Sequence, residues 1–442
     1  MTVDRTRVLV PIAEPIGGQM SAVGIRQLEV GRALASHCDV TFASTAETND
    51  DCHGVSIVRC RTHADFRALL RDHDVLYTLG LNADRYLDVV RSGIRVVLDL
   101  YTPLAFEVME CWPEVPDAVM EPLHRRSVRW TLAQLAQADF IICASEPQKD
   151  LWLGMMNAAG VLTVGESRRD PGWHERIAVV PFGVPDERPQ ARGHPLRDRL
   201  PALSNSDFLL LWSSNVLAWQ DPDTLIRAMA VVREQNPKIR LVFLGIGEPK
   251  PTNGSMYDNA KLPTKRTRIL ADELGLTNQT VFFMSERVPY REIGMYYRDA
   301  DAAVATYPDS LETRICLGSR LLDYLWAGLP MIVSGVRLQR EFVEGQGLGL
   351  VAPPHDVAKL ASAILQVKYE VANGSYAPLV FEQAMERLRW SRVVDPIVTY
   401  CQSKKARVRR SRPRRISARL SLAEFIVRSI GCRLNARLHD VR

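Results

Sequence analysis

The feature that most constrains the fold of this chain is a series of short apolar runs separated by helical patterns. The first half holds five such runs, at residues 7–12, 39–44, 75–80, 95–100 and 140–145. They are rich in β-branched residues and mostly closed by turn residues, which is typical of buried parallel strands. Helical patterns such as "GIRQLEVGRALASH" lie between them. Alternation of this kind predicts right-handed βαβ units on a parallel sheet.

The series then starts again. Five more runs follow, at residues 208–214, 239–247, 280–286, 302–308 and 329–335. The break at 186–205, "DERPQARGHPLRDRLPALSN", is rich in proline and charge and is interpreted as an interdomain linker. One large α/β sheet would give a similar pattern, but we favour two doubly wound, Rossmann-like α/β domains. Their strand ends would face each other across a ligand-binding cleft.

Composition places the chain among soluble globular proteins. It has 442 residues, 46% of them hydrophobic and 24% charged, which is enough for two domains. The apolar run near the N-terminus is only "VLV", and no window reaches the roughly 18 apolar residues of a membrane span. The eight cysteines include no C-x-x-C pair. We therefore expect a cytoplasmic protein without a metal or other cofactor.

Charge is distributed unevenly along the chain. Residues 403–442 hold 13 Lys/Arg and two acids, whereas the remainder holds 43 Lys/Arg and 49 acids. A basic run at 404–415 precedes a capping box at 421–424 and a basic amphipathic pattern. This tail suits an anionic membrane surface, which would make the protein peripheral on the inner face of the membrane. An oligomerisation helix, an RNA-binding arm or a disordered tail are the alternatives, and nucleic acid is not an expected partner.

The segment 311–330, "LETRICLGSRLLDYLWAGLP", carries the clearest candidate site. A helix that starts at Ser319 leaves its first amides without intrahelical partners, beside Arg314 and Arg320. A diphosphate would satisfy these amides and both guanidinium groups. Asp323 lies one turn further along and suits the vicinal hydroxyls of a ribose. A solvent-exposed helix start is the alternative, and we favour the nucleotide interpretation.

The stretch "SRLLDYLWAGLPMIVS" resembles the sugar-nucleotide helix of retaining GT-B glycosyltransferases, which typically read E-G-F-G-x-x-x-x-E-A-M-A-C-G-x-P. Other segments resemble the same family in order and spacing: "ADFIICASEPQKDLW", "IAVVPFGVP", "LVFLGIGEP" and "DADAAVATY". The resemblance covers roughly residues 1–400. It implies transfer of a sugar from a nucleotide-diphosphate donor to an acceptor hydroxyl, with retention of configuration, in cell-surface glycan or glycoconjugate synthesis. We expect a saccharide acceptor or, where the tail binds a membrane, a lipid-linked one.

Carried over position by position, the resemblance implies a donor site built by both domains. Asp323 stands where the family binds the donor ribose. The resemblance also implies backbone contacts to the diphosphate, a glycine loop in the first domain and a loop that reads the base edge. The residues at these positions are Leu317, Gly318, Ser319, Gly17, Gly18, Arg287 and Val288.

The sequence departs from the family at three positions. The first family acid falls on Ile315, so Glu312 would have to take its place near the sugar hydroxyls. The family's Arg and Lys fall on about Asn215 and Gln220. Arg314 and Arg320 would then neutralise the phosphates, and we expect these two and Glu312 to act in catalysis.

Asp99 is a further catalytic candidate, at the end of the run 95–100. It would bond the sugar or the acceptor hydroxyl if it points into the cleft. Capping of the following segment, 102–109, is the alternative role.

The predicted domains follow from these boundaries. An acceptor-side domain spans 1–187, a linker 188–204 and a nucleotide-sugar domain 205–385, followed by a helical region at 386–402 and the tail at 403–442. A catalytically silent nucleotide-sugar-binding or scaffold protein, tethered by its tail, is the main alternative to a glycosyltransferase. A nucleotide-sugar epimerase would need a cluster of acids and a histidine in the cleft, and no such cluster stands out in the sequence.

Overall fold

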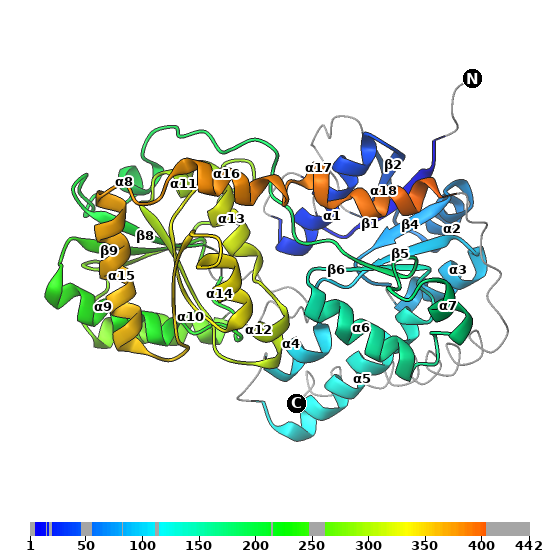
Figure 1. Ribbon diagram of the computed structural model, residues 1–442, viewed down its shortest axis with the longest axis horizontal. Coiled ribbons are helices and arrows are strands. Elements are labelled where there is room, and N and C mark those ends of the chain that lie inside the picture. Colours follow the sequence, from blue (N-terminus) through cyan, green and yellow to red (C-terminus); the bar gives the residue numbers. More distant parts are fainter. Residues whose placement is uncertain are drawn as a thin grey trace, which may run out of the picture.

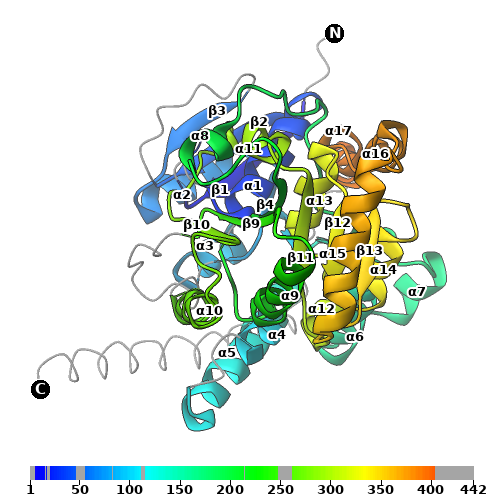
Figure 2. The same ribbon diagram turned by 90° about the vertical axis from the view of Figure 1, so that its left-hand side faces the viewer.

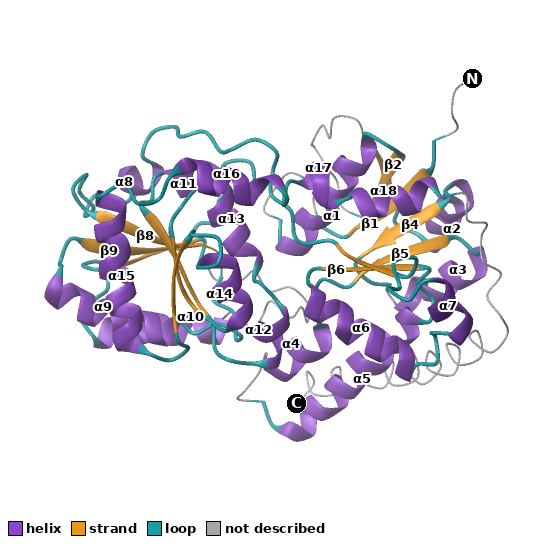
Figure 3. Cartoon of the chain, viewed as in Figure 1, coloured by secondary structure: helices purple, strands orange, loops and turns teal. Residues whose placement is uncertain are grey.

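The structure is a computed structural model, in which two lobes lie side by side (Figure 1). Strands fill the interior of each lobe and helices cover them (Figure 3). The described residues are 5–14, 16, 20–45, 55–81, 83–110, 115–213, 215–246 and 261–403.

The N-terminal lobe contains a seven-stranded parallel sheet with the order β3-β2-β1-β4-β5-β6-β7. Its strands are β1 (Arg7–Ile12), β2 (Asp39–Ser44), β3 (Ser56–Arg59), β4 (Val75–Thr78), β5 (Arg95–Asp99), β6 (Phe140–Cys143) and β7 (Ile177–Val179). Its helices are α1 (Ala22–Ala35), α2 (His63–Asp72), α3 (Ala83–Ser92), α4 (Leu104–Glu110), α5 (Asp117–Leu135), α6 (Glu146–Ala158) and α7 (Val164–Arg169).

The C-terminal lobe contains a six-stranded parallel sheet with the order β10-β9-β8-β11-β12-β13. Its strands are β8 (Phe208–Ser213), β9 (Ile239–Leu244), β10 (Val281–Met284), β11 (Ala302–Thr306), β12 (Met331–Ser334) and β13 (Gly349–Ala352). Its helices are α9 (Pro222–Gln235), α10 (Lys261–Glu273), α11 (Ile293–Arg298), α12 (Leu311–Ile315), α13 (Ser319–Ala327), α14 (Arg337–Val343), α15 (Val357–Ala372) and α16 (Pro378–Glu386). Figure 2 shows this lobe from the side, with α9 beside α15.

Alternation along each strand supplies apolar side chains to both faces of each sheet. In β1, Val8 and Val10 pack with α1, whereas Leu9 joins the opposite cluster with α2, α3, α5 and α6. In β8, Leu210 packs with α9 and α15, whereas Leu211 faces the side of α13. Strands buried on both faces read as continuous apolar runs, which is why the sequence revealed them.

The C-terminal helices return to the N-terminal lobe, where α17 (Trp390–Val393) lies beside α1 and α18 (Asp395–Gln402) follows it (Figure 1). Val184 forms a parallel bridge with Arg389, and the ring of Tyr400 stacks on Phe140 with centroids 4.7 Å apart. The Thr6 hydroxyl donates to the carbonyl of Cys401 at 2.9 Å. This return fixes the chain's last described helix to the first domain.

The two separate sheets confirm the prediction of two doubly wound α/β domains rather than one sheet. All ten predicted strands form, within a few residues of the expected ends. Three short strands, β3, β7 and β13, were not predicted as strands from their apolar patterns. Most of β3 is exposed and β7 has three residues, so neither leaves a strong apolar run. Strand β13 is as short as the predicted strand β12 and mostly buried, and it was missed. The expected linker contains a short helix, α8 (Pro195–Arg199).

Two predictions lie outside the described residues. They are the glycine loop with Gly17 and Gly18, and the basic tail beyond Ser403. In the part of the chain that is described, no helix is both long and apolar enough to cross a membrane.

Candidate functional site

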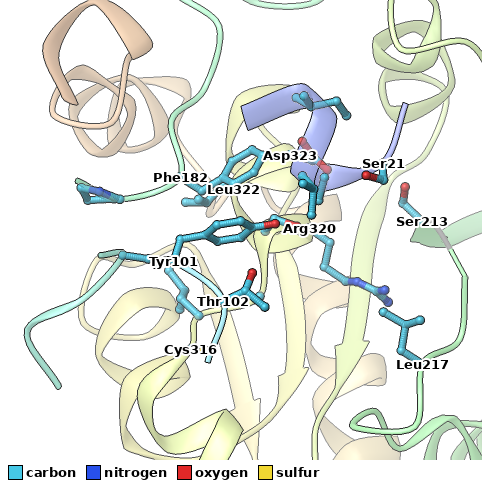
Figure 4. A pocket seen from close by; sticks show the side chains of 18 of the residues that line it. Ser21, Tyr101, Thr102, Phe182, Ser213, Leu217, Cys316, Arg320, Leu322 and Asp323 are labelled. Carbon is cyan, nitrogen blue, oxygen red and sulfur yellow. The ribbon is translucent and has the colours of Figure 1, made fainter. Parts of the chain in front are cut away.

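A cavity of about 1830 Å³ lies between the two lobes and is lined by residues of both. Strand order explains its position. In each parallel sheet, successive strands are added first on one side and then on the other, and this order switches between β1 and β4 and between β8 and β11. Open α/β sheets bind ligands outside such switch points. Loops that follow β1 and β8, and the start of α13, reach the cavity. Figure 4 shows Arg320 and Asp323 on one side of it and Tyr101 and Thr102 on the other.

The start of α13 requires a glycine. Gly318 has φ +37°, and an added Cβ would lie 2.4 Å from the hydroxyl of Tyr307. A side chain is therefore excluded by both backbone conformation and space. The buried Tyr307 hydroxyl has no hydrogen-bond partner among the described residues, and it lines the cavity. Gly318 thus leaves room for a ligand against the tyrosine hydroxyl and the first helical amides.

Asp323 lines the cavity one turn along α13. The Tyr297 hydroxyl lies 3.4 Å from its Oδ2 and 2.7 Å from the hydroxyl of Ser213. Burial raises the pKa of the Asp323 carboxyl to about 7, although the nearby Arg320 guanidinium opposes that rise. A half-buried carboxyl of this kind, at the cavity wall, can accept hydrogen bonds from the hydroxyl groups of a ligand.

Arg320 is a cavity residue with 6% of its surface exposed. Its guanidinium lies over the indole of Trp212, 4.7 Å from the ring centroid, and Nη2 donates to the carbonyl of Asn215 at 3.2 Å. Stacking and a backbone bond hold the planar group in one orientation.

Asn215, at the approximate position of a family arginine, holds another arginine in place. With its amide oriented to satisfy both groups, its side chain accepts from Arg287 Nη2 at 2.9 Å and donates to the carbonyl of Gly245 at 3.2 Å. Arg287 and Val288 line the cavity, and their contact with a base stays a prediction. Gln220 also lines the cavity, but its Oε1 accepts from the backbone of Leu217 at 2.9 Å.

The expectation that Arg314 lies beside Arg320 at the diphosphate site is wrong. Its side chain is 59% exposed and forms an ion pair with Asp309, at 2.7 Å from Nε to Oδ1, and it is not among the residues that line the cavity. Helix α12 ends at Ile315, and the chain then turns before α13 begins, so Arg314 and Arg320 do not share one helical face. Sequence proximity therefore overstated their spatial proximity.

The expectation that Asp99 points into the cleft is also wrong. Its carboxylate accepts from Arg26 Nε at 2.6 Å, from Arg26 Nη2 at 3.2 Å and from the Tyr77 hydroxyl at 2.7 Å. Both side chains of the Arg26–Asp99 pair are fully buried, and neither lines the cavity. The backbone amide of Tyr101 also donates to Asp99, at 3.2 Å. Asp99 is therefore a structural residue that holds α1 against β5.

Glu312 lies in the cavity wall, whereas Ile315 does not. The Ile315 carbonyl instead accepts from the hydroxyl of Ser145 in the N-terminal lobe, at 2.7 Å. Burial, followed by the charge of Glu107, raises the pKa of the Glu312 carboxyl to about 8. The acid that α12 supplies to the cavity is therefore Glu312.

Two acids from the N-terminal lobe, Glu107 and Glu110 of α4, approach Glu312 and were missed in the sequence. Glu110 accepts from the hydroxyl of Ser310 at 3.0 Å and from the amide of Glu312 at 3.4 Å. Glu107 lines the cavity, and burial, followed by the charge of Glu110, raises its carboxyl pKa to about 8. An acid inside the apolar run "LAFEVM" was the available signal.

The raised pKa of Glu107 predicts a pH-dependent gain in stability for Glu107→Gln. In wild type, the unfolded carboxyl loses its proton above about pH 4.5 while the folded one keeps it until about pH 8, so stability falls between these values. We expect the variant to be more stable than wild type at pH 8 by roughly 1 to 4 kcal/mol, with little difference at pH 4. Urea unfolding at both pH values measures the difference, and an equal effect at both would contradict the buried acid.

Residues 199–370 match the family described as Glycosyl transferases group 1. A D-inositol 3-phosphate glycosyltransferase from Thermomonospora curvata is 24% identical over 232 residues, which are 51% of this chain and 51% of that protein. The chain thus matches about half the length of this curated relative.

Solved structures resemble almost the whole chain. The Anabaena protein HepE, in complex with UDP and glucose, is 13% identical with a TM-score of 0.60, covering 89% of this chain and 98% of that one. Sucrose-phosphate synthase from Thermosynechococcus elongatus is 18% identical with a TM-score of 0.59 and the same coverage. The chain has the GT-B fold. The expected resemblance to GT-B glycosyltransferases is confirmed, at low sequence identity.

Both lobes contribute charged and polar residues to the wall of the cavity. Helix α13 provides Arg320 and Asp323, its N-cap residue is Gly318, and α12 provides Glu312. Helix α4 of the other lobe provides Glu107. Across the described ranges, no group of three or more His, Cys, Asp or Glu side chains could hold a metal ion.

Proposed function

We propose that this protein is a glycosyltransferase that moves a sugar from a nucleotide-diphosphate sugar to an acceptor hydroxyl. The observation that carries the proposal is the start of α13, where Gly318, Arg320 and Asp323 together open into the interdomain cavity. This helix lies inside the segment that matches Glycosyl transferases group 1. The Anabaena neighbour, solved with UDP and glucose, supports a uridine nucleotide as the first donor to test.

In this proposal, each cavity residue has a role that follows from its chemistry. The amides of Leu317, Gly318 and Ser319 bind the diphosphate, and Arg320 neutralises it. Asp323 accepts bonds from the ribose hydroxyls. Four further cavity residues serve the ends of the donor, Arg287 and Val288 at the base, and Glu312 and the Tyr307 hydroxyl near the sugar and diphosphate.

The proposed reaction retains configuration. The bond between the anomeric carbon and the diphosphate oxygen breaks, and the acceptor oxygen bonds to that carbon on the same face. The acceptor's proton passes to the departing diphosphate, so the protein need not supply a strong base. Its contribution is to orient both substrates and to stabilise the charge that develops on the diphosphate.

The acceptor and the location are also parts of the proposal. A saccharide or lipid-linked acceptor in cell-surface glycan synthesis would bind on the N-terminal side of the cavity. Association of the basic tail, 403–442, with an anionic membrane surface would bring such an acceptor close.

Ligand-induced stabilisation is the experiment that tests the proposed function. We expect one of UDP, GDP, ADP and dTDP, at about 100 times its dissociation constant, to raise the free energy of unfolding by about 2.7 kcal/mol. Asp323→Ala should weaken that shift, because the ribose hydroxyls lose their acceptor. Asp272→Ala, an exposed acid on α10, is the control and should keep the full shift.

Absence of a shift with all four nucleotides would contradict the proposal. It would favour a catalytically silent scaffold, which the departures at Ile315, Asn215 and Gln220 also fit. A shift without turnover of any nucleotide sugar, in the presence of an acceptor extract, would favour a silent nucleotide-sugar-binding protein.

A further inference from the structure

Glu107 and Glu312 form an acidic wall of the cavity, with one residue from each domain. Their exposed fractions are 6% and 7%, and both line the cavity. Glu107 stands on α4 and Glu312 on α12, two helices that pack against each other at the domain interface. The wall therefore exists only where the two domains meet.

The third acid nearby, Glu110, already has hydrogen-bond donors from the other domain. It accepts from the Ser310 hydroxyl and from the amide of Glu312, so it joins the domains rather than facing a ligand. The Glu107 carboxyl, in contrast, has no hydrogen bond and no ion pair with any described residue. The side-chain partner of Glu312 is the thiol of Cys316, which Gln148 Nε2 approaches at 3.0 Å.

Buried carboxyl groups without a cation are unfavourable, because the charged form has lost its water. The titratable neighbours of Glu312 are Glu107, Glu110, Cys316 and Tyr307, none of which carries a positive charge. Within the described residues, neither Glu107 nor Glu312 pairs with a lysine or arginine. The two carboxyls thus lack the counter-charge that buried acids normally have.

The chemistry of the missing partner follows from the donor count. A metal ion is disfavoured because the wall belongs to no metal-competent group of three or more side chains in the described part of the chain. A neutral hydroxyl donates one hydrogen and leaves the second carboxyl without compensation. A primary ammonium group donates three hydrogens and carries the missing charge, so it can bond both carboxylates at once.

We propose that Glu107 and Glu312 form a subsite for the ammonium group of an amino sugar, held between the two domains. This inference rests on the proposed function, since it names the sugar class that the same cavity takes. The amino sugar is either the sugar of the donor or the acceptor, and the two share this chemistry.

Isothermal titration calorimetry at pH 7 tests the acceptor arm, with the protein saturated by the nucleoside diphosphate that stabilises it. The probes are D-glucosamine, D-glucose and N-acetyl-D-glucosamine, the last of which keeps the nitrogen but not the charge. We expect glucosamine to bind about tenfold or more tightly than either neutral sugar, as charge-assisted hydrogen bonds require. The donor arm compares a nucleotide-linked amino sugar with its neutral counterpart, without free sugar.

Glu107→Gln and Glu312→Gln should each remove most of the preference for the charged sugar. Glu121→Gln, an exposed acid of α5 paired with Arg125, is the matched control and should keep it. At pH 7 the two carboxyls hold protons, because their pKa values are raised to about 8. Binding of the ammonium group should release these protons, which titration in two buffers of different ionisation enthalpy detects. A purely structural role of Glu107 would alter thermal stability without altering this preference or the proton release.

The outcomes separate this inference from the proposed function. Preference in the first arm alone assigns the amino sugar to the acceptor, and preference in the second assigns it to the donor. Nucleotide binding with no preference in either arm overturns the subsite while leaving the proposed function intact. If no nucleotide binds, the proposed function fails, and titration of glucosamine against glucose without nucleotide then decides the subsite alone.

Discussion

Replacing Asp99 by Ala should lower the free energy of unfolding of the N-terminal domain by about 3 to 5 kcal/mol. The substitution leaves the Arg26 guanidinium fully buried and without the carboxylate that now accepts two of its hydrogen bonds. Two bonds remain, to the carbonyls of Pro181 at 2.9 Å and Val180 at 2.8 Å. These carbonyls cannot balance a whole charge, and the Tyr77 hydroxyl loses its acceptor as well.

Urea unfolding, followed by circular dichroism, measures this loss. The double variant Arg26→Met/Asp99→Leu is the control, because removal of both charges should recover most of the stability. A loss below about 1 kcal/mol in Asp99→Ala would show that water reaches Arg26, contrary to its burial. A stable Asp99→Ala protein with greatly reduced turnover would revive the catalytic role predicted from the sequence.

Replacing Arg320 by Ala should reduce kcat/KM for the donor about 100-fold to 1000-fold, if the proposed function is correct. Arg320 is the arginine of α13 that lies in the cavity, and its orientation is fixed by Trp212 and the carbonyl of Asn215. Negative charge on the departing diphosphate grows in the transition state. Loss of the guanidinium therefore removes more stabilisation from the transition state than from the bound substrate. The reduction should therefore fall on kcat as well as on KM.

Steady-state kinetics with the donor identified by thermal shift measures this effect. Arg320→Lys should restore only part of the rate, because an ammonium group keeps the charge but not the planar stacking. Arg314→Ala is the matched control and should keep nearly full activity, since its side chain is exposed and paired with Asp309. If Arg320 contacts the diphosphate, Arg320→Ala should weaken binding of the nucleoside diphosphate more than binding of the nucleoside monophosphate. An unchanged ratio of these two affinities would contradict that contact.

The fold was largely predictable because its strands are buried on both faces and read as apolar runs. The segment "RVVLDL", for example, matches β5 within one residue. The limits lay at the sheet edges. In β3, Ser56 and most of its neighbours are exposed, so no apolar pattern distinguishes the strand from a loop. The resemblance around Asp323 was equally readable, because a helix and its flanking glycines are local features.

The candidate site was only partly predictable. Gly318, Arg320, Asp323, Arg287 and Val288 were each named from the sequence, and the structure brings all five to the cavity wall.

Glu107 was not named, because its importance depends on a contact between α4 and α12, which lie about 200 residues apart in the chain. Arg314 was named because it is near Arg320 in sequence, yet the turn after α12 separates them.

The sequence by itself therefore determined the two parallel sheets, their order along the chain and the helix that carries Arg320 and Asp323. These follow from local patterns of burial and from helix-start chemistry, which neighbouring residues fix together. Only the tertiary structure decided which charges face the cavity. Asp99 is kept from the cavity by its fully buried ion pair with Arg26, a residue 73 positions away in the chain. Glu107 and Glu312 form one acidic wall only because the two domains meet. The solvation and partners of a charge depend on distant segments, and the primary sequence does not place those segments.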